Sequence, residues 1–251
     1  NENTGLDFSE YKFSTLARRV ARRVNVCKCE TFKEYYRLLQ TNPDEVSILF
    51  KEFLIGVTKF FRDPRVWEIL SDDLIPEIIE RKDDGETLKV WDVACSTGEE
   101  AYSLAMYINE ELRKQNKDLK VKIFATDIAK QHLEIGGNGV YSESTIADID
   151  TELVKKYFIK HSDGYQVVEK IRRMVIFSQH NIIKNPPFSN MDMILCRNLL
   201  IYFQQSIQHK TLNVLHYALK ENGFLILGTS ETVNSHREHF DEISRKWKIY
   251  R

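Results

Sequence analysis

The chain has 251 residues, of which 42% are hydrophobic and 29% charged, and its formal net charge is -1 at pH 7. This composition is typical of a globular protein with one large domain, or with a core domain and a smaller attached one. The near-zero net charge gives no overall attraction to nucleic acid or to a membrane, so a partner bound by charge needs a local patch. No apolar run approaches the roughly 20 residues of a bilayer-spanning helix, and no signal peptide is apparent.

The four cysteines form no pair of the C-x-x-C type used by zinc sites. Cys27 and Cys29 form a C-x-C pair that no second Cys/His pair completes, so we interpret it as a chance pair rather than a metal site. Four cysteines without a C-x-x-C pair in a chain of this size favour a reducing compartment. We therefore expect a cytoplasmic protein with no metal and no membrane insertion.

The N-terminal part of the chain shows helical spacing and no strand pattern. Residues 8–24 place apolar side chains three and four positions apart, which predicts an amphipathic helix. Further helices are predicted over 31–40 and 43–55, each beginning at a start signal. We therefore predict a small all-helical domain over residues 1–82, which ends in a polar linker.

The first predicted helix carries two arginine pairs one turn apart, namely Arg18, Arg19, Arg22 and Arg23. No acidic residue lies between Lys12 and Cys29. The band is either a solvated helix face, as most charge runs are, or a docking site for an acidic partner.

A strand, a turn and a helix are predicted over residues 88–112. The apolar run 88–95 predicts a buried strand, Gly98 lets the backbone approach a ligand, and apolar residues then recur at helical spacing. In an open parallel sheet this junction lies where ligands bind. Glu99 and Glu100 stabilise the helix N-terminus but disfavour phosphate there, so they suit a ligand that carries a cation, such as an amino group.

Further strands are predicted over 120–127, within 172–183, within 191–203 and over 223–229, with an edge strand at the C-terminus. A polar residue follows each predicted strand of the sheet: Glu100, Asp127, Asn181, Arg197 and Glu231. The carboxyl ends of parallel strands lie on one side of a doubly wound sheet, so these residues define a crevice. Asp127 is placed either to accept hydrogen bonds from ribose hydroxyls or to cap the following helix.

Residues 136–171 interrupt the alternation of strands and helices. A glycine-rich loop at 136–139 and an alternating strand at 165–171 predict an inserted antiparallel subdomain. A separate stretch, residues 56–64, contains a pair of phenylalanines, Phe60 and Phe61. The pair belongs either to the core or, with Thr58 and Arg62, to a corner that closes over a ligand.

These segments together resemble the chemotaxis receptor methyltransferase (CheR) family. The matching pieces are TKFFR, WDVACSTGEEAYSLAM, FATDI, HNII, CRNLLIYF and GTSET, which occur in the family's order across almost the whole chain. The resemblance implies an α/β fold: a Rossmann-like doubly wound methyltransferase sheet over residues 83–251, with the inserted antiparallel subdomain and the small helical N-terminal domain.

The resemblance also implies an enzyme. It would transfer methyl from S-adenosylmethionine, leaving S-adenosylhomocysteine, to glutamate side chains on acidic cytoplasmic helices of chemoreceptors. The family's cofactor contacts fall on Thr58, Arg62, Glu100, Asp127, Asn181, Ile182, Cys196 and Arg197. Tyr202 corresponds to the family tyrosine near the transferred methyl and, with Arg62, would orient the glutamate. The arginine band would dock on the receptor helix.

Three departures from the family's pattern stand out. Gly56 replaces a frequent Asn, Ala101 replaces the usual Pro, which a first helical turn tolerates, and the turn at 161–164 is short. The short turn argues against docking on a receptor C-terminal peptide.

Three alternatives stay open. They are a methyltransferase for a small molecule or another protein, a non-catalytic module that binds the donor, and a nicotinamide dehydrogenase. The glycine turn matches neither G-x-G-x-x-G nor G-x-x-x-x-G-K-[ST], which argues against the last.

Overall fold

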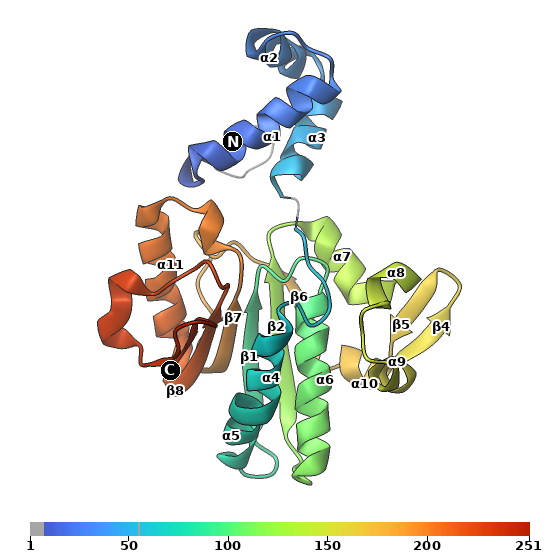
Figure 1. Ribbon diagram of the computed structural model, residues 1–251, viewed down its shortest axis with the longest axis vertical. Helices are drawn as coiled ribbons and strands as arrows, with labels where there is room; N and C mark the ends of the chain where they lie inside the picture. The colour runs from blue at the N-terminus through green and yellow to red at the C-terminus, as the bar shows by residue number, and fades with distance from the viewer. Residues whose placement is uncertain (1–7, 55) are drawn as a thin grey trace. The chain divides into compact units, whose positions relative to one another are not determined.

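The computed structural model of the protein describes residues 8–54 and 56–251 (Figure 1). The chain divides into two compact units. The first consists of Asn1–Gly56 and Tyr202–Gln208, and the second of Val57–Ile201 and His209–Arg251.

The first unit is helical and contains η1 (Phe8–Glu10), α1 (Phe13–Val26), α2 (Phe32–Thr41) and α3 (Pro43–Phe53). The helix predicted over 31–40 is confirmed as α2, and the one predicted over 43–55 is confirmed up to Phe53, since residue 55 lies outside the described residues. Local signals fix where both helices start. The Thr31 side chain accepts a hydrogen bond from the Glu34 N–H, and the Asn42 side chain accepts from the first turn of α3. The first helix begins at Phe13 rather than residue 8, since Tyr11 is extended and pairs with Phe203 as an isolated β-bridge.

A buried ion pair joins α1 to α3 within this unit. The Arg23 Nε and Nη2 donate to the two carboxylate oxygens of Glu45 at 2.9 and 2.7 Å, and the Tyr35 hydroxyl donates to Glu45 Oε1 at 2.7 Å. Hydrogen bonding from Arg23 lowers the pKa of Glu45, because it favours the charged carboxylate. Arg23 is thus engaged inside the unit, so we remove it from the docking band that the sequence predicted.

Replacing Arg23 with Met is expected to lower the free energy of unfolding of the first unit by about 3–5 kcal/mol, because Glu45 is then buried without its counter-charge. The Glu45 carboxylate stabilises the wild type above its unfolded pKa of about 4.3, and that stabilisation is lost as pH falls through the lower folded pKa. Amide hydrogen exchange of α1–α3 in the full chain measures both effects. Exchange as slow in Arg23→Met as in the wild type would contradict the structural role, and the double variant Arg23→Met with Glu45→Met should recover much of the protection.

The second unit is built on a seven-stranded sheet in the order β6-β2-β1-β7-β8-β10-β9. Its parallel strands are β1 (Thr87–Val93), β2 (Lys120–Asp127), β6 (Val175–Gln179), β7 (Met191–Cys196) and β8 (Leu219–Leu227). The chain order of the strands reverses at β1, with β2 on one side and β7 on the other. In open α/β sheets ligands bind outside the carboxyl ends of the strands at such a point. The predicted doubly wound sheet is confirmed.

The C-terminal end of the sheet differs from the prediction. β10 (Ile249–Tyr250) pairs antiparallel with both β8 and β9 (Glu242–Ser244), so β9 is the edge strand, and the expected edge position of the last residues was wrong. The three residues of β9 have no alternating pattern, so only pairing with β10 makes them a strand.

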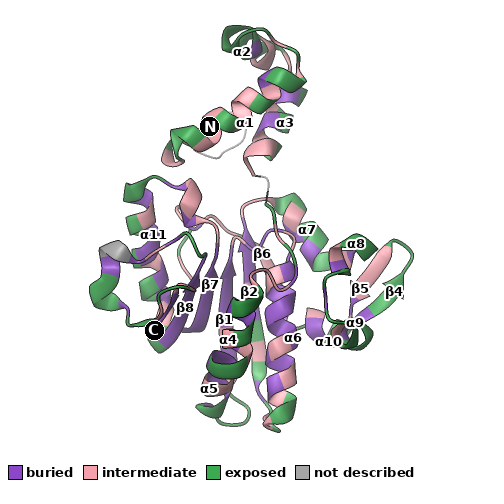
Figure 2. Ribbon diagram, viewed as in Figure 1, coloured by how far each residue is buried: buried purple, intermediate pink, exposed green. Residues whose placement is uncertain are grey.

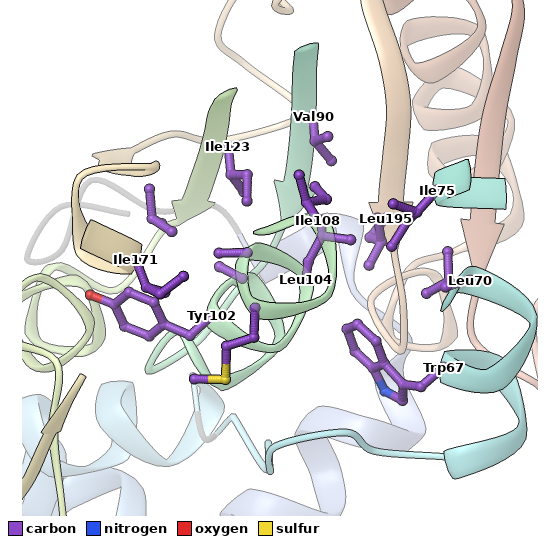
Figure 3. Close-up of a cluster of buried hydrophobic side chains, with 14 of the residues drawn as sticks. Trp67, Leu70, Ile75, Val90, Tyr102, Leu104, Ile108, Ile123, Ile171 and Leu195 are labelled. Carbon is purple, nitrogen blue, oxygen red and sulfur yellow. The ribbon is translucent and has the colours of Figure 1, made fainter. Parts of the chain in front are cut away.

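Four helical segments lie over one face of this sheet (Figure 1): α4 (Pro64–Ile69), the π-helical turn η2 (Leu70–Leu74), α5 (Ile75–Glu80) and α6 (Glu99–Lys114). Trp67, Leu70 and Ile75 pack into one buried cluster with Leu104 of α6 and Val90 of β1 (Figure 3). The sequence placed residues 57–82 with the N-terminal helices. In the structure they belong to the second unit, because their apolar side chains are buried in its core.

A small antiparallel sheet in the order β3-β5-β4 interrupts the second unit, as predicted. It contains β3 (Val140–Tyr141), β4 (Phe158–His161) and β5 (Gly164–Val167), with α8 (Glu143–Ile146) and α9 (Thr151–Tyr157) beside them. Gly164 has φ 142°, and a Cβ there would lie 2.2 Å from the Tyr141 carbonyl oxygen, so only glycine fits.

Two boundaries of the inserted segment were wrong. Residues 136–138, expected in a loop, end helix α7 (Lys130–Asn138), which stops at Gly139 with φ 62°. The strand expected over 165–171 ends at Val167, and α10 (Glu169–Arg172) follows. The remaining helical segments are η3 (Leu200–Tyr202), α11 (Gln205–Ala218) and η4 (Asn234–His239).

Burial is continuous along the middle of the large sheet (Figure 2). Every residue of β7 is buried, as are the last four of β1. Across the described part of the chain, no helix has the length and apolar character needed to cross a membrane.

Candidate functional site

The turn between β1 and α6 is held in an unusual backbone conformation. Ala94, Ser96 and Gly98 all have positive φ, at 59°, 50° and 91°. The left-handed region costs a non-glycine residue about 1–2 kcal/mol, and strain of this kind gathers at ligand sites. Hydrogen bonds from the Cys95 N–H to the Thr126 carbonyl and from the Gly98 N–H to the Cys95 carbonyl hold the turn.

Asp127, at the end of β2, ties this turn to the neighbouring strand. Its Oδ2 accepts from the Ser96 N–H at 2.9 Å and its Oδ1 from the Ala129 N–H at 2.8 Å. The residue is 9% exposed. Asp127 therefore shapes the turn and the entry to α7, and each carboxylate oxygen keeps a further lone pair that can accept from a ligand.

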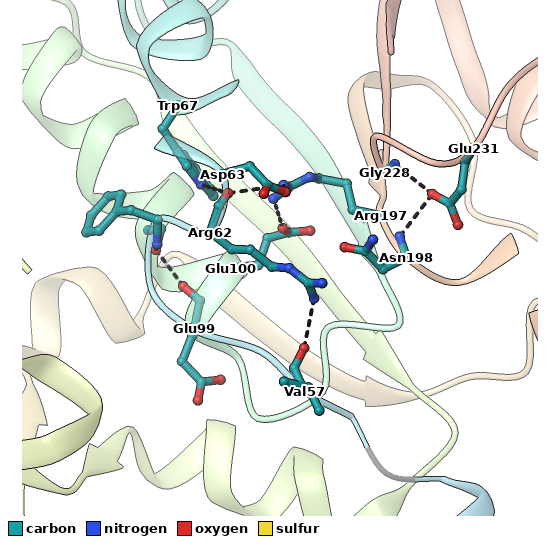
Figure 4. Close-up of polar contacts among 12 residues, drawn as sticks. Val57, Arg62, Asp63, Trp67, Glu99, Glu100, Arg197, Asn198, Gly228 and Glu231 are labelled. Atoms are coloured by element: carbon teal, nitrogen blue, oxygen red, sulfur yellow. Dashed lines mark hydrogen bonds and ion pairs between the residues drawn. The ribbon is translucent and has the colours of Figure 1, made fainter. Parts of the chain in front are cut away.

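Arg197, which follows β7, lies at the centre of a buried network (Figure 4). Its Nη1 donates to Glu100 Oε2, and its Nη2 donates to Asp63 Oδ2 at 2.6 Å and to the Arg62 carbonyl at 3.1 Å. The Arg197 side chain is only 1% exposed. Burial opposes its charge, but Glu100 and Asp63 more than offset this and raise the pKa of Arg197. The guanidinium thus stays charged and joins α6, β7 and the segment before α4.

Asp92 of β1 was missed by the sequence reasoning. It is fully buried, and within the described residues neither carboxyl oxygen has a hydrogen-bond partner. Burial, and then the nearby charge of Glu100, raise the pKa of Asp92 well above its usual range. Its signal was visible as an acid inside the apolar run V-W-D-V.

The segment 57–63 is tied to the same network. The Arg62 guanidinium donates to the Val57 carbonyl at 2.9 Å, and the Phe61 N–H donates to Ser103 Oγ of α6 at 3.1 Å. Phe60 is buried against Tyr141. Phe60 therefore belongs to the hydrophobic core rather than to a corner that closes over a ligand. Thr58 and Arg62 are half-buried.

The other predicted contacts come from β6 and β7. Asn181 follows β6, and its Oδ1 accepts from the Ile183 N–H at 3.0 Å, while Ile182 is buried. Cys196 ends β7 with its thiol buried, and burial raises the pKa of that thiol well above its usual range. A thiol held protonated in this way is inert, so it contributes packing rather than nucleophilic chemistry.

Glu231 has a structural role at the same end of the sheet. Its carboxylate accepts from the backbone N–H groups of Gly228, Asn198 and Ile201 at 2.6, 2.9 and 3.3 Å. These bonds fix the loops after β7 and β8, including Asn198 with φ 63°. Glu231 was predicted only as a crevice residue, and the structure gives the reason for its position.

All eight predicted cofactor contacts lie in the second unit. Three of them are connected by hydrogen bonds, since Arg197 donates to the Glu100 carboxylate and to the backbone carbonyl of Arg62. Tyr202 and the predicted arginine band lie in the first unit. There the Tyr202 carbonyl accepts from the Lys12 N–H at 2.8 Å, and Arg18 and Arg22 are exposed. In residues 8–54 and 56–251, no group of three or more His, Cys, Asp or Glu is placed to hold a metal ion.

Two family models match the chain. One is described as "CheR methyltransferase, SAM binding domain" and matches residues 56–249, and the other as "CheR methyltransferase, all-alpha domain" and matches residues 1–54. Together with the parallel sheet, they define the class of protein as a Rossmann-like methyltransferase that uses S-adenosylmethionine. The chain belongs to the CheR methyltransferase family.

Three relatives illustrate the similarity. A protein of Rhodobacter capsulatus, named only as an uncharacterized 104.1 kDa protein in the hypE 3' region, is 35% identical over 245 residues, covering 98% of this chain and 26% of that protein. The chemotaxis protein methyltransferase of Borreliella burgdorferi is 30% identical, covering 94% and 86%. That of Listeria innocua is 30% identical, covering 91% and 85%. The chain thus spans about a quarter of the first relative's length and most of the other two.

Proposed function

We propose that this protein transfers the methyl group of S-adenosylmethionine to glutamate side chains on the cytoplasmic helices of chemoreceptors, and so acts in the cytoplasm. The observation that carries the proposal is the match to the CheR SAM-binding domain over residues 56–249, with Asp127 at the end of β2 and Glu100 in the first turn of the helix that follows β1. Relatives named chemotaxis protein methyltransferase support the substrate class.

The residues present fit this cofactor. Glu100 lies beside the fully buried Asp92, and the two form an acidic pair suited to an ammonium group. Asp127 keeps free lone pairs for a ribose diol. We assign the amino group to Glu100 and the ribose to Asp127, with Arg197 holding Glu100 in place. The remaining assigned contacts are Thr58, Arg62, Asn181, Ile182 and Cys196.

The proposed reaction asks the protein to position and desolvate a carboxylate. A glutamate side chain is already ionised at pH 7, since its ordinary pKa is about 4.3, so no general base is needed. When bound, the cofactor would supply a methyl group on a positively charged sulfur, and that sulfur would leave as the neutral thioether of S-adenosylhomocysteine. Arg62 would orient the incoming carboxylate. Arg62 also donates to the Val57 carbonyl, which limits how tightly it holds the substrate before transfer.

A transfer assay tests the proposal. Purified protein is incubated with methyl-labelled S-adenosylmethionine and a receptor cytoplasmic fragment, and base-labile label on receptor glutamates is the expected result. Label on a different protein or on a small molecule would support the first alternative. Donor binding without transfer to any acceptor would identify a non-catalytic module and reject the enzyme.

Arg62→Ala is expected to lower kcat by about 10²-fold, because the carboxylate loses an orienting group. The fold should persist, since the Arg62 contacts with Trp67 and Arg197 are made by its backbone carbonyl. Lys59→Ala removes an exposed positive charge three residues away and serves as the control. Equal kcat in the two variants would remove Arg62 from the reaction.

Reversing the charge of Arg18, Arg19 and Arg22 to Glu is expected to lower kcat/KM for the receptor by about tenfold at low salt, with the difference shrinking as salt screens the surface. Affinity for the donor should not change, because none of these three residues is among those assigned to the cofactor. The control reverses three exposed charges of the second unit, Lys210, Arg245 and Lys246. Receptor methylation unaffected at every salt concentration would favour the solvated-face interpretation.

A further inference from the structure

Asp92 lies in the middle of the large sheet, where a buried carboxyl group is unfavourable unless it is paired. It pairs in register with Ala125 of β2 and Leu195 of β7, and its side chain is fully buried. Both of its oxygens are without a hydrogen-bond partner among the described residues, as is the buried Nε of Arg197. A buried polar group left unpaired is costly, and such groups are rare in folded proteins.

The charged groups around Asp92 do not compensate a negative charge there. Glu100 faces it from α6 and Asp127 from the end of β2, and both are acids. Arg197 is the cation among its neighbours. However, both terminal nitrogens of Arg197 are already committed, one to Glu100 and the other to Asp63. An ionised Asp92 would therefore be a buried carboxylate close to those of Glu100 and Asp127. The nearby cation, Arg197, already binds the carboxylates of Glu100 and Asp63.

We infer that Asp92 carries a proton in the free protein, donates it to Glu100, and releases it to solvent when the donor's ammonium group binds at Glu100. The inference rests on the proposed assignment of that ammonium group to Glu100. The step breaks the Asp92 O–H bond and passes the proton to water, with no change of oxidation state.

This assignment explains the unpaired oxygens. A protonated carboxyl is a hydrogen-bond donor, and the Glu100 carboxylate beside it accepts from Arg197 on one oxygen and has lone pairs to spare. Burial and the Glu100 charge both raise the pKa of Asp92, which agrees with the protonated form. An added cation at Glu100 reverses this balance, because it favours the charged carboxylate. Asp92 is thus a positioning residue that adjusts the charge of the site to its ligand.

The proton makes donor affinity depend on pH. Where free Asp92 is protonated and bound Asp92 is ionised, affinity rises tenfold for each pH unit. The same linkage means that binding releases a proton, which can be counted. Calorimetry of S-adenosylhomocysteine binding at pH 7, in buffers of different ionisation enthalpy, gives that number.

The wild type is expected to release close to one proton more than Asp92→Asn, whose neutral amide has the same shape as the protonated acid. Subtracting the two cancels any proton that the ligand's own amino group takes up. Glu99→Gln is the matched control, since Glu99 is also a buried acid of this turn with a pKa raised by burial. It should release protons as the wild type does.

Equal proton release by the wild type and Asp92→Asn would overturn the inference. Absence of S-adenosylhomocysteine binding to the wild type would instead overturn the proposed function on which it rests. If Asp92→Asn does not fold, infrared difference spectra of the wild type give the same answer. Ligand binding should remove the C=O band of a protonated carboxyl, and an unchanged band would overturn the inference.

Discussion

Replacing Arg197 with Met is expected to destabilise the second unit by about 3–5 kcal/mol, because breaking a buried ion pair leaves an uncompensated charge inside the protein. Two carboxylates lose their partner, Glu100 with a side chain 13% exposed and Asp63 with one 34% exposed. The more buried Glu100 should account for most of the loss. Urea unfolding of the full chain, followed by tryptophan fluorescence, measures it, since Trp67 is buried in this unit.

The same change is expected to weaken S-adenosylhomocysteine binding by about 10–100-fold, the value of one hydrogen bond to a charged group, since Glu100 is no longer held by Arg197. Arg197→Lys should recover only part of both effects, because an ammonium lacks the fork that reaches Glu100 and Asp63 together. Arg81→Met is the control, since its pairing with Glu77 is exposed and is worth about 0–1 kcal/mol. Arg197→Met no less stable than Arg81→Met would mean that the network is not a structural centre.

Asp127→Ala is expected to abolish measurable donor binding, with affinity at least about 10²-fold lower. The change removes the carboxylate assigned to the ribose, and it also frees the Ser96 N–H that Asp127 holds at 2.9 Å. A buried N–H without an acceptor costs about 1–3 kcal/mol, which adds to the strain already stored at Ala94 and Ser96. The turn should therefore lose its shape as well as its ligand contact.

Asp127→Asn distinguishes the two contributions, since an amide offers one acceptor oxygen where the acid offers two. It keeps a bond to either Ser96 or Ala129 and should show intermediate affinity and stability. Asp148→Ala, at an exposed position of the inserted segment, is the control for both measurements. Calorimetry with S-adenosylhomocysteine and urea unfolding are the assays. Donor affinity in Asp127→Ala equal to that of Asp148→Ala would remove Asp127 from the site.

Local sequence signals predicted the elements that local interactions fix. β2 occupies residues 120–127 as expected, and α2 and α3 start at their capping residues Thr31 and Asn42. The position of polar residues after each strand also predicted where Glu100, Asp127 and Arg197 would gather. That rule works because parallel strands end on the same side of a sheet, whatever the side chains in between.

Helical spacing could not say which core the helices of residues 64–80 join. An apolar stripe records that a face is buried but not its partner, and Trp67 and Leu70 pack in the second unit. Similarly, the three residues of β9 carry no pattern of their own, and pairing with β10 alone makes them a strand.

The sequence by itself determined the α/β class, the helical N-terminal part and the end of the sheet at which polar side chains gather, because periodicity, caps and strand ends are local properties. Only the tertiary structure decided how the charges are used. Arg23 forms an ion pair with Glu45, 22 residues away in the sequence. Arg197 binds Glu100 and Asp63, which are 97 and 134 residues away in the sequence. It also left both carboxyl oxygens of Asp92 without a hydrogen-bond partner in the part of the chain that the structure describes. The physical reason is that the state of a buried charge depends on neighbours brought together by folding, which no spacing along the chain records.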